Sequence, residues 1–227
     1  CSSDLVVLQE TKMEDHKFPD DALASLGYRS VFVGQKTYNG VAILSKVSAK
    51  EEQIGIPGFD DEQKRVIAAT VNGIRIVNLY VVNGQDVGTD KYDYKLRWLD
   101  AVHGWLAEEI KKYPNLVVLG DFNDTYNTKA IKEIVGVGKN KLVDTRPAEK
   151  NGDNLPNPSN PRYSPRNETW THYYGVEDSY SRIDYLMLSP GMAKEWIKAD
   201  TYIPVVANWG QASDHRPILA TFEAQNQ

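Results

Sequence analysis

Short apolar runs, each bounded by turn residues, recur along this chain and constrain its fold more than any other feature. Runs of four to nine residues with such boundaries are typical of β-strands. The first of them reads as buried on both faces. Two others flank Asn72-Gly73, which favours a type I′ turn, so residues 65–82 are expected to form an antiparallel hairpin. Strands are predicted at Leu5–Gln9, Val41–Leu44, Val66–Val71, Ile74–Val82, Leu116–Leu119, Arg182–Leu188 and Pro217–Phe222.

Helices are fewer than strands in this pattern. Apolar residues repeat at intervals of three and four from Tyr94 to about Lys112, which predicts one long amphipathic helix. Shorter helices are expected near Pro19–Leu26 and Thr128–Val135, and residues 151–167, rich in Pro, Asn, Ser and Arg, are expected to form a loop. The combination predicts an α/β (α+β) sandwich, with two mixed, largely antiparallel β-sheets packed face to face and flanked by helices.

Length and charge narrow the possible functions. The 227 residues are expected to form a single domain over 1–227. No apolar run is long enough to span a membrane, so no membrane association is expected. The net charge of −5 requires that a polyanionic ligand be held by local cations or metal ions. One cysteine fits a reducing compartment, so a cytoplasmic location is expected, with export as the alternative.

Polar side chains follow or begin several of the predicted strands. Carboxylates gathered at strand ends repel one another unless a cation or a hydrogen-bond network holds them. Their convergence would therefore indicate a metal ion that prefers oxygen ligands, such as Mg²⁺. The residues at these strand ends are Glu10, Lys12, Tyr80, Asn83, Asp121, Asn123, Asp184, Asp214 and His215.

The sequence suggests which of these side chains lie close to one another. In an extended segment Asp121 and Asn123 would face one ligand together, while Phe122 faces the core. Asp184 lies inside an apolar run, where an unpaired carboxylate is costly, and His215 is its natural partner.

Each of these residues also has a purely structural explanation. A lone Asp or Asn after a strand is most often a turn or helix cap. Tyr80 alone reads as a core or rim aromatic residue, and Asp184 alone as half of an ordinary buried ion pair. His16 and His103 are interpreted as surface or helix-packing residues without a role in the site. The functional interpretation depends on the whole set.

Six segments in their order along the chain resemble the endonuclease/exonuclease/phosphatase superfamily, and within it the exonuclease III-like branch of abasic-site endonucleases. The segments are LQETK (8–12), NGVAILSK (39–46), LYVVNGQ (79–85), GDFN (120–123), RIDYLMLSP (182–190) and SDHRPI (213–218). The resemblance implies the exonuclease III/DNase I fold. It also implies a Mg²⁺-dependent DNA phosphodiesterase of base excision repair, an AP endonuclease and 3′-5′ exodeoxyribonuclease that hydrolyses the phosphodiester with activated water.

The resemblance also implies roles for individual residues. Glu10 binds the metal with Asp214 nearby, and Mn²⁺ is a possible substitute for Mg²⁺. The catalytic set implied is Tyr80, Asp121, Asn123, Asp184 and His215. The substrate-binding set is Lys12, Tyr38, Asn39, Asn83 and Trp170, with Trp170 in the position of an aromatic residue that lines a pocket for a flipped abasic sugar. The expected partner is DNA, as a duplex with an abasic site, bound by a monomer.

Two departures from the family pattern leave alternatives open. The family's first strand, which carries an Asn, has no counterpart here, so the chain as made is expected either to have contained it or to have an impaired site. The segment between Asn123 and Asp144 is shorter than in abasic-site endonucleases. This favours, as a second interpretation, a general nuclease or phosphoesterase acting on other phosphodiesters or phosphomonoesters. A third is a non-catalytic binding module, against which the complete acid and imidazole set argues. The lysines, Lys91 and Lys95 among them, are DNA contacts or simply a solvated face.

Overall fold

A six-stranded mixed sheet forms the centre of the molecule. The computed structural model describes residues 3–85, 87–126, 128–146, 148–150, 169–204 and 209–223. The strand order of the central sheet is β4-β5-β6-β7-β12-β8, in which β6 and β7 are parallel and every other pair is antiparallel. These strands are β4 (Lys50–Ile54), β5 (Val66–Val71), β6 (Ile74–Tyr80), β7 (Leu116–Asp121), β8 (Val143–Asp144) and β12 (Asp184–Leu188).

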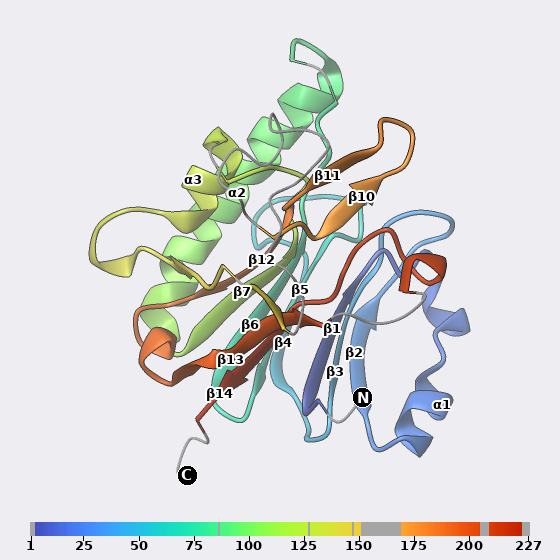
Figure 1. Ribbon diagram of the computed structural model, residues 1–227, viewed down its shortest axis with the longest axis vertical. Coiled ribbons are helices and arrows are strands. Elements are labelled where there is room, and N and C mark those ends of the chain that lie inside the picture. Colours follow the sequence, from blue (N-terminus) through green and yellow to red (C-terminus); the bar gives the residue numbers. More distant parts are fainter. Residues whose placement is uncertain are drawn as a thin grey trace.

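Two three-stranded sheets make up the second layer. Their strands are β1 (Leu5–Gln9), β2 (Arg29–Val33) and β3 (Val41–Ser45), in the order β1-β3-β2, and β9 (Ala148–Lys150), β13 (Trp196–Pro204) and β14 (Leu219–Phe222), in the order β14-β13-β9. One core cluster joins both small sheets to the central one, since it includes Ile43 from β3, Ile76 from β6 and Phe222 from β14. Figure 1 shows the two small sheets on the same side of the central sheet. The predicted sandwich is therefore confirmed.

Helices cover the opposite face of the central sheet. The long helix α2 (Asp90–Lys112) and the short α3 (Lys129–Val135) pack there, with Trp98, Leu99 and Val102 in the second core cluster (Figure 1). The remaining elements are α1 (Asp20–Ser25), β10 (His172–Tyr174), β11 (Ser179–Ser181) and the 3₁₀ turns η1 (Asp15–Lys17), η2 (Gly138–Asn140), η3 (Met192–Lys194) and η4 (Trp209–Gln211). All three predicted helices are confirmed. None of the helices in the described ranges is both long enough and apolar enough to cross a membrane.

Local chemistry explains where the expected boundaries hold and where they move. Asn72 and Gly73 have φ of 49° and 75°, as a type I′ turn requires, so the predicted hairpin is confirmed. Helix α2 begins at Asp90, before the expected Tyr94, because the Thr89 hydroxyl caps it by accepting from the backbone N–H of Tyr92 at 3.2 Å.

Other expectations about strands are wrong or incomplete. Strand β1 is not buried on both faces, since its residues are only partly buried and Leu8 is 37% exposed. Strands β2, β4 and β13 were not predicted from apolar runs; β4 is an edge strand with the polar sequence KEEQI, as is common where a sheet meets water. The loop expected at 151–167 lies outside the described residues.

Candidate active site

The register of three central strands places three of the predicted catalytic residues side by side. In the parallel pair β6–β7, Tyr80 lies opposite Asp121, and in the antiparallel pair β7–β12, Asp121 lies opposite Asp184. Gly120 permits this close pairing: its φ is +137°, and a Cβ there would lie 2.0 Å from the backbone oxygen of Leu79. A hydroxyl and two carboxylates therefore lie in neighbouring positions at the same end of these three inner strands.

Asp121 is buried at the centre of this row. It is 5% exposed, its Oδ1 accepts from the backbone N–H of Asn123 at 2.8 Å, and its Oδ2 lies 3.9 Å from Nε2 of His215. Asn123 has φ of 49°, so the expected extended geometry is wrong here: the chain turns, and the Asn123 amide donates to the Val81 carbonyl at 2.9 Å. Phe122 faces the core as predicted, with 0% exposure. Asn123 thus reaches Asp121 through its backbone.

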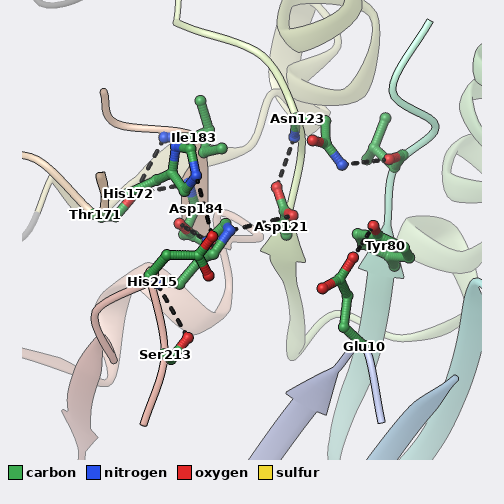
Figure 2. Close-up of polar contacts among 12 residues, drawn as sticks. Glu10, Tyr80, Asp121, Asn123, Thr171, His172, Ile183, Asp184, Ser213 and His215 are labelled. Carbon is green, nitrogen blue, oxygen red and sulfur yellow. Dashed lines mark hydrogen bonds and ion pairs between the residues drawn. The ribbon is translucent and has the colours of Figure 1, made fainter. Parts of the chain in front are cut away.

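Asp184 holds His215 in one orientation. Nδ1 of His215 lies 2.9 Å from Oδ2 and 3.1 Å from Oδ1 of Asp184. The start of β12 is fixed in turn by Thr171, whose hydroxyl oxygen accepts from the backbone N–H groups of Ile183 and Asp184 at 3.1 Å each. The pair expected from the sequence is therefore in contact, with Nε2 of His215 directed toward Asp121 (Figure 2).

Burial and neighbouring charges shift the protonation of this group. Burial alone would lower the pKa of His215, but the hydrogen bond and negative charge of Asp184 outweigh it and raise the pKa to about 9. Burial, followed by the charge of Asp184, raises the pKa of Asp121 to about 8. At neutral pH, in the absence of further cations, the site holds an imidazolium and a carboxyl group that resists ionisation.

Glu10 and Tyr80 form a second contact on the other side of Asp121 (Figure 2). The Tyr80 hydroxyl donates to Oε1 of Glu10, and Nζ of Lys12 lies 2.7 Å from Oε2. Burial opposes ionisation of Glu10, but the hydrogen bonds from Lys12 and Tyr80 outweigh it and lower its pKa. Burial and the bond to Glu10 raise the pKa of Tyr80, and the guanidinium of Arg65 lies 4.7 Å from its ring centre. Tyr80 is thus a neutral donor that orients Glu10.

The donor set of this region fits a divalent cation. Two groups in the described ranges have ligand atoms within 4.8 Å of one another: one is Asp121, Asp184 and His215, and the other is His172, Asp214 and His215. Glu10 belongs to neither group. The carboxylate oxygens among them, like those of Glu10, suit Mg²⁺ or Mn²⁺. Burial is the largest cause of the raised pKa of Asp121, and the charge of Asp184 adds to it, so a cation bound here would offset both effects.

The residues predicted to bind substrate differ in how exposed their side chains are. Asn83 is exposed and lines a cavity of about 470 Å³ together with Arg65, Lys91 and Tyr94. Tyr38 is 68% exposed. Both side chains are therefore accessible to a ligand.

Asn39 and Lys95 are instead buried in internal contacts. Asn39 is 3% exposed, and its amide donates to Gln35 at 3.0 Å and to Gln63. Its backbone carbonyl accepts from the N–H of Lys12 at 2.9 Å, so Asn39 supports the loop that carries Lys12. Lys95 is paired with Asp124 at 2.7 Å, and only 9% of its side chain is exposed. The interpretation of Lys95 as a solvated or DNA-contacting lysine is wrong, because this ammonium group anchors the segment after β7 to α2.

The indole ring of Trp170 packs against the guanidinium group of Arg216. The Arg216 guanidinium is 4.2 Å from the Trp170 ring centre, and one of its N–H groups donates to the Trp170 carbonyl at 3.3 Å. The ring also meets Tyr180 edge-on with 5.0 Å between centres. Aromatic and cationic groups therefore stack next to the segment that leads to His215.

Sequence reasoning missed His172, Thr171 and Arg65. His172 lies two positions after Trp170, so the rule that alternate residues of an extended segment share a side would have selected it. Thr171 and Arg65 act through a hydroxyl contact and a stacking contact, for which one sequence contains no distinguishing signal.

A mixed sandwich with carboxylates and an imidazole–carboxylate pair at the ends of its central strands defines a hydrolase of the exonuclease III/DNase I fold. The chain belongs to the Endonuclease/Exonuclease/phosphatase family, whose sequence model matches residues 1–215. The resemblance predicted from the motifs is thereby confirmed.

Relatives of known name support this membership. Exodeoxyribonuclease III of Haemophilus influenzae is 25% identical over 97% of this chain and 90% of its own. The structure of the 3′ phosphatase NExo from Neisseria, bound to a product DNA hairpin, is 31% identical, with a TM-score of 0.79 over 97% of this chain and 89% of that one. An AP endonuclease from Archaeoglobus fulgidus is 26% identical, with a TM-score of 0.78 over 96% and 88%. The chain is a hydrolase of the exonuclease III type.

Proposed function

We propose that this chain is a Mg²⁺-dependent DNA phosphodiesterase of base excision repair, acting as an AP endonuclease and a 3′-5′ exonuclease. The observation that carries the proposal is the register that aligns Tyr80, Asp121 and Asp184 beside His215. The names of the relatives, an exodeoxyribonuclease, a DNA-bound 3′ phosphatase and an AP endonuclease, support DNA as the substrate.

Asp121 is the proton acceptor for the attacking water in this proposal. Its pKa of about 8 belongs to the site without a cation. The positive charge of a bound metal ion would lower this pKa, so that Asp121 would be ionised near neutral pH and able to accept the proton. Asn123, which is bonded to Asp121 through its backbone, holds a phosphoryl oxygen with its side-chain amide. The water is thereby placed between the base and the phosphorus atom.

His215 stabilises the charge that develops on the phosphoryl oxygens. Its raised pKa keeps it an imidazolium at neutral pH, and its Nδ1 is occupied by Asp184, so Nε2–H is the donor available to the substrate. Asp184 fixes the ring orientation throughout the reaction.

The carboxylates on either side of this centre are the proposed metal ligands. Glu10, oriented by Tyr80, and Asp214 would hold Mg²⁺, with Mn²⁺ as a substitute. When bound, the ion supplies positive charge that polarises the phosphoryl group and offsets the charge of the transition state. Lys12 adds positive charge next to these carboxylates, and the guanidinium of Arg65 lies over the ring of Tyr80.

A specific observation favours the second interpretation, a general nuclease or phosphoesterase acting on other phosphodiesters or phosphomonoesters. Asp60, Asp61 and Glu62 line the cavity next to Asn83 and Arg65. Three acids would repel a DNA backbone that continued through this cavity, whereas a terminal phosphate does not need to cross it. Hydrolysis of a terminal phosphomonoester is therefore the main alternative to incision within a strand.

The test uses a duplex oligonucleotide with one stable abasic analogue, with Mg²⁺ or with EDTA. The same duplex without the analogue and a duplex ending in a 3′-phosphate are incubated alongside, and Asp121→Asn controls for contaminating nucleases. Metal-dependent incision next to the analogue supports the endonuclease, with a 3′-hydroxyl as the expected product. Release of terminal nucleotides without incision would support the 3′-5′ exonuclease alone, and release of inorganic phosphate alone would replace the proposal by the phosphoesterase. Equal activity of Asp121→Asn would overturn the proposed mechanism.

A further inference from the structure

A second histidine, His172, is built into the site by backbone pairing. His172 on β10 lies opposite His215 in an antiparallel bridge, and the flanking backbone groups bond across it: Tyr173 N–H to Asp214 O at 2.9 Å and Arg216 N–H to Thr171 O at 2.6 Å. Directly opposed residues project to the same side of such a pair. The two imidazole rings are accordingly 4.5 Å apart, centre to centre.

The contacts of His172 determine which ring nitrogen carries its proton. Nδ1 lies 3.4 Å from Oγ of Ser181, and Nε2 lies 3.7 Å from Oδ2 of Asp214. A hydroxyl can donate to Nδ1, whereas a carboxylate can only accept, so the favoured tautomer has its N–H on Nε2, facing Asp214.

Asp214 needs such a partner if it is to act as a ligand. Its side chain is 68% exposed, so burial does not restrict its rotamer. Groups that donate to a ligating carboxylate orient it, and their loss weakens metal binding about 10- to 100-fold. A chain of polar contacts thus runs from Ser181 through His172 to Asp214, beside the Asp184–His215 pair.

We propose that His172 is a positioning residue that orients the Asp214 carboxylate for the metal ion of the active site. This inference rests on the proposed function, in which Asp214 binds the ion. His172 acts through Asp214, and its ring lies 4.5 Å from that of His215, centre to centre.

The test measures Mn²⁺ binding directly, by electron paramagnetic resonance of the free ion, so that the readout does not depend on turnover. His172→Phe keeps a ring beside His215 but has no N–H, whereas His172→Gln retains an amide N–H that can reach Asp214. His103→Gln, on the exposed side of α2, is the matched control. Ser181→Ala, which removes the hydroxyl partner of Nδ1, is an independent variant in case the Phe protein does not fold.

We expect His172→Phe to raise the Kd for Mn²⁺ by about 10-fold or more, with His172→Gln and Ser181→Ala in between and His103→Gln equal to wild type. The Mg²⁺ concentration for half-maximal activity should rise in the same order. The inference is overturned if His172→Phe binds Mn²⁺ with wild-type affinity. If His172→Phe does not fold, wild-type affinity of a folded Ser181→Ala overturns it instead. Neither result would affect the proposed function. If wild-type protein binds no Mn²⁺ and needs no metal for activity, the proposed function fails as well.

Discussion

Replacing Asp184 with Asn removes the negative charge that keeps His215 protonated. In the wild-type protein Oδ2 of Asp184 lies 2.9 Å from Nδ1 of His215, and the pKa of His215 rises from 6.5 to about 9. At about 1.4 kcal/mol per pKa unit, this shift corresponds to about 3 kcal/mol in favour of the imidazolium. An Asn side chain preserves the volume but not the charge, and burial then acts against the charged ring.

We expect the pKa of His215 in Asp184→Asn to fall from about 9 toward 6.5. The remaining acids near the ring, Asp121 and Asp214, oppose this fall but have a smaller effect than Asp184. NMR titration of the imidazole Cε1–H signals in wild type and variant measures this pKa directly. A fall of less than about one unit would show that Asp184 does not control the protonation of His215.

The raised pKa of His215 also predicts how the stability and the activity of the protein change with pH. Because the pKa of His215 is higher in the folded than in the unfolded protein, it contributes stability that is fully present below pH 6.5 and is lost as the pH rises to about 9. In Asp184→Asn this loss should largely disappear, as urea unfolding on both sides of that window would show. Turnover that requires the imidazolium should decline through about pH 9 in wild type and at lower pH in the variant.

Three further substitutions test separate parts of the structure. Asp121→Asn should lower turnover by about 10³-fold or more in a steady-state assay, yet raise the free energy of unfolding at alkaline pH, because a buried carboxyl that resists ionisation is removed. Thr171→Val leaves two backbone N–H groups without their acceptor and should cost about 2 kcal/mol or more in urea unfolding. Lys95→Met leaves the partly buried Asp124 without its cation and should cost about 3 kcal/mol, while the salt dependence of DNA binding stays unchanged.

The layered fold could be predicted because its inner strands are continuous apolar runs. Strands such as β5 and β7 are buried on both faces and are recognisable without any partner. Edge strands such as β4 bury little, so their sequence is set by contact with water and resembles a loop. The order of strands in the central sheet depends on contacts between distant segments, for which a single sequence has no local signal.

The residues of the site were easier to predict than their geometry. Asp184 and His215 were paired by the cost of an unpaired buried carboxylate, and the structure brings them together. Asn123 was expected in an extended segment, but its left-handed backbone turns it back toward Asp121. A turn of this kind depends on the Val81 carbonyl of a neighbouring segment and cannot be read from residue spacing.

The site lies where three sheets meet, and this determines which mutations away from it should matter. Glu10 follows β1 of one small sheet, Tyr80 and Asp121 end strands of the central sheet, and His215 precedes β14 of the other small sheet. Distances between these groups are therefore set by how closely the layers pack, through the core cluster shared by all three sheets. Interiors are close-packed, so a change of volume at this layer interface shifts the sheets relative to one another. Such a change should alter activity more than an equal change beneath α2, which packs on the opposite face of a single sheet.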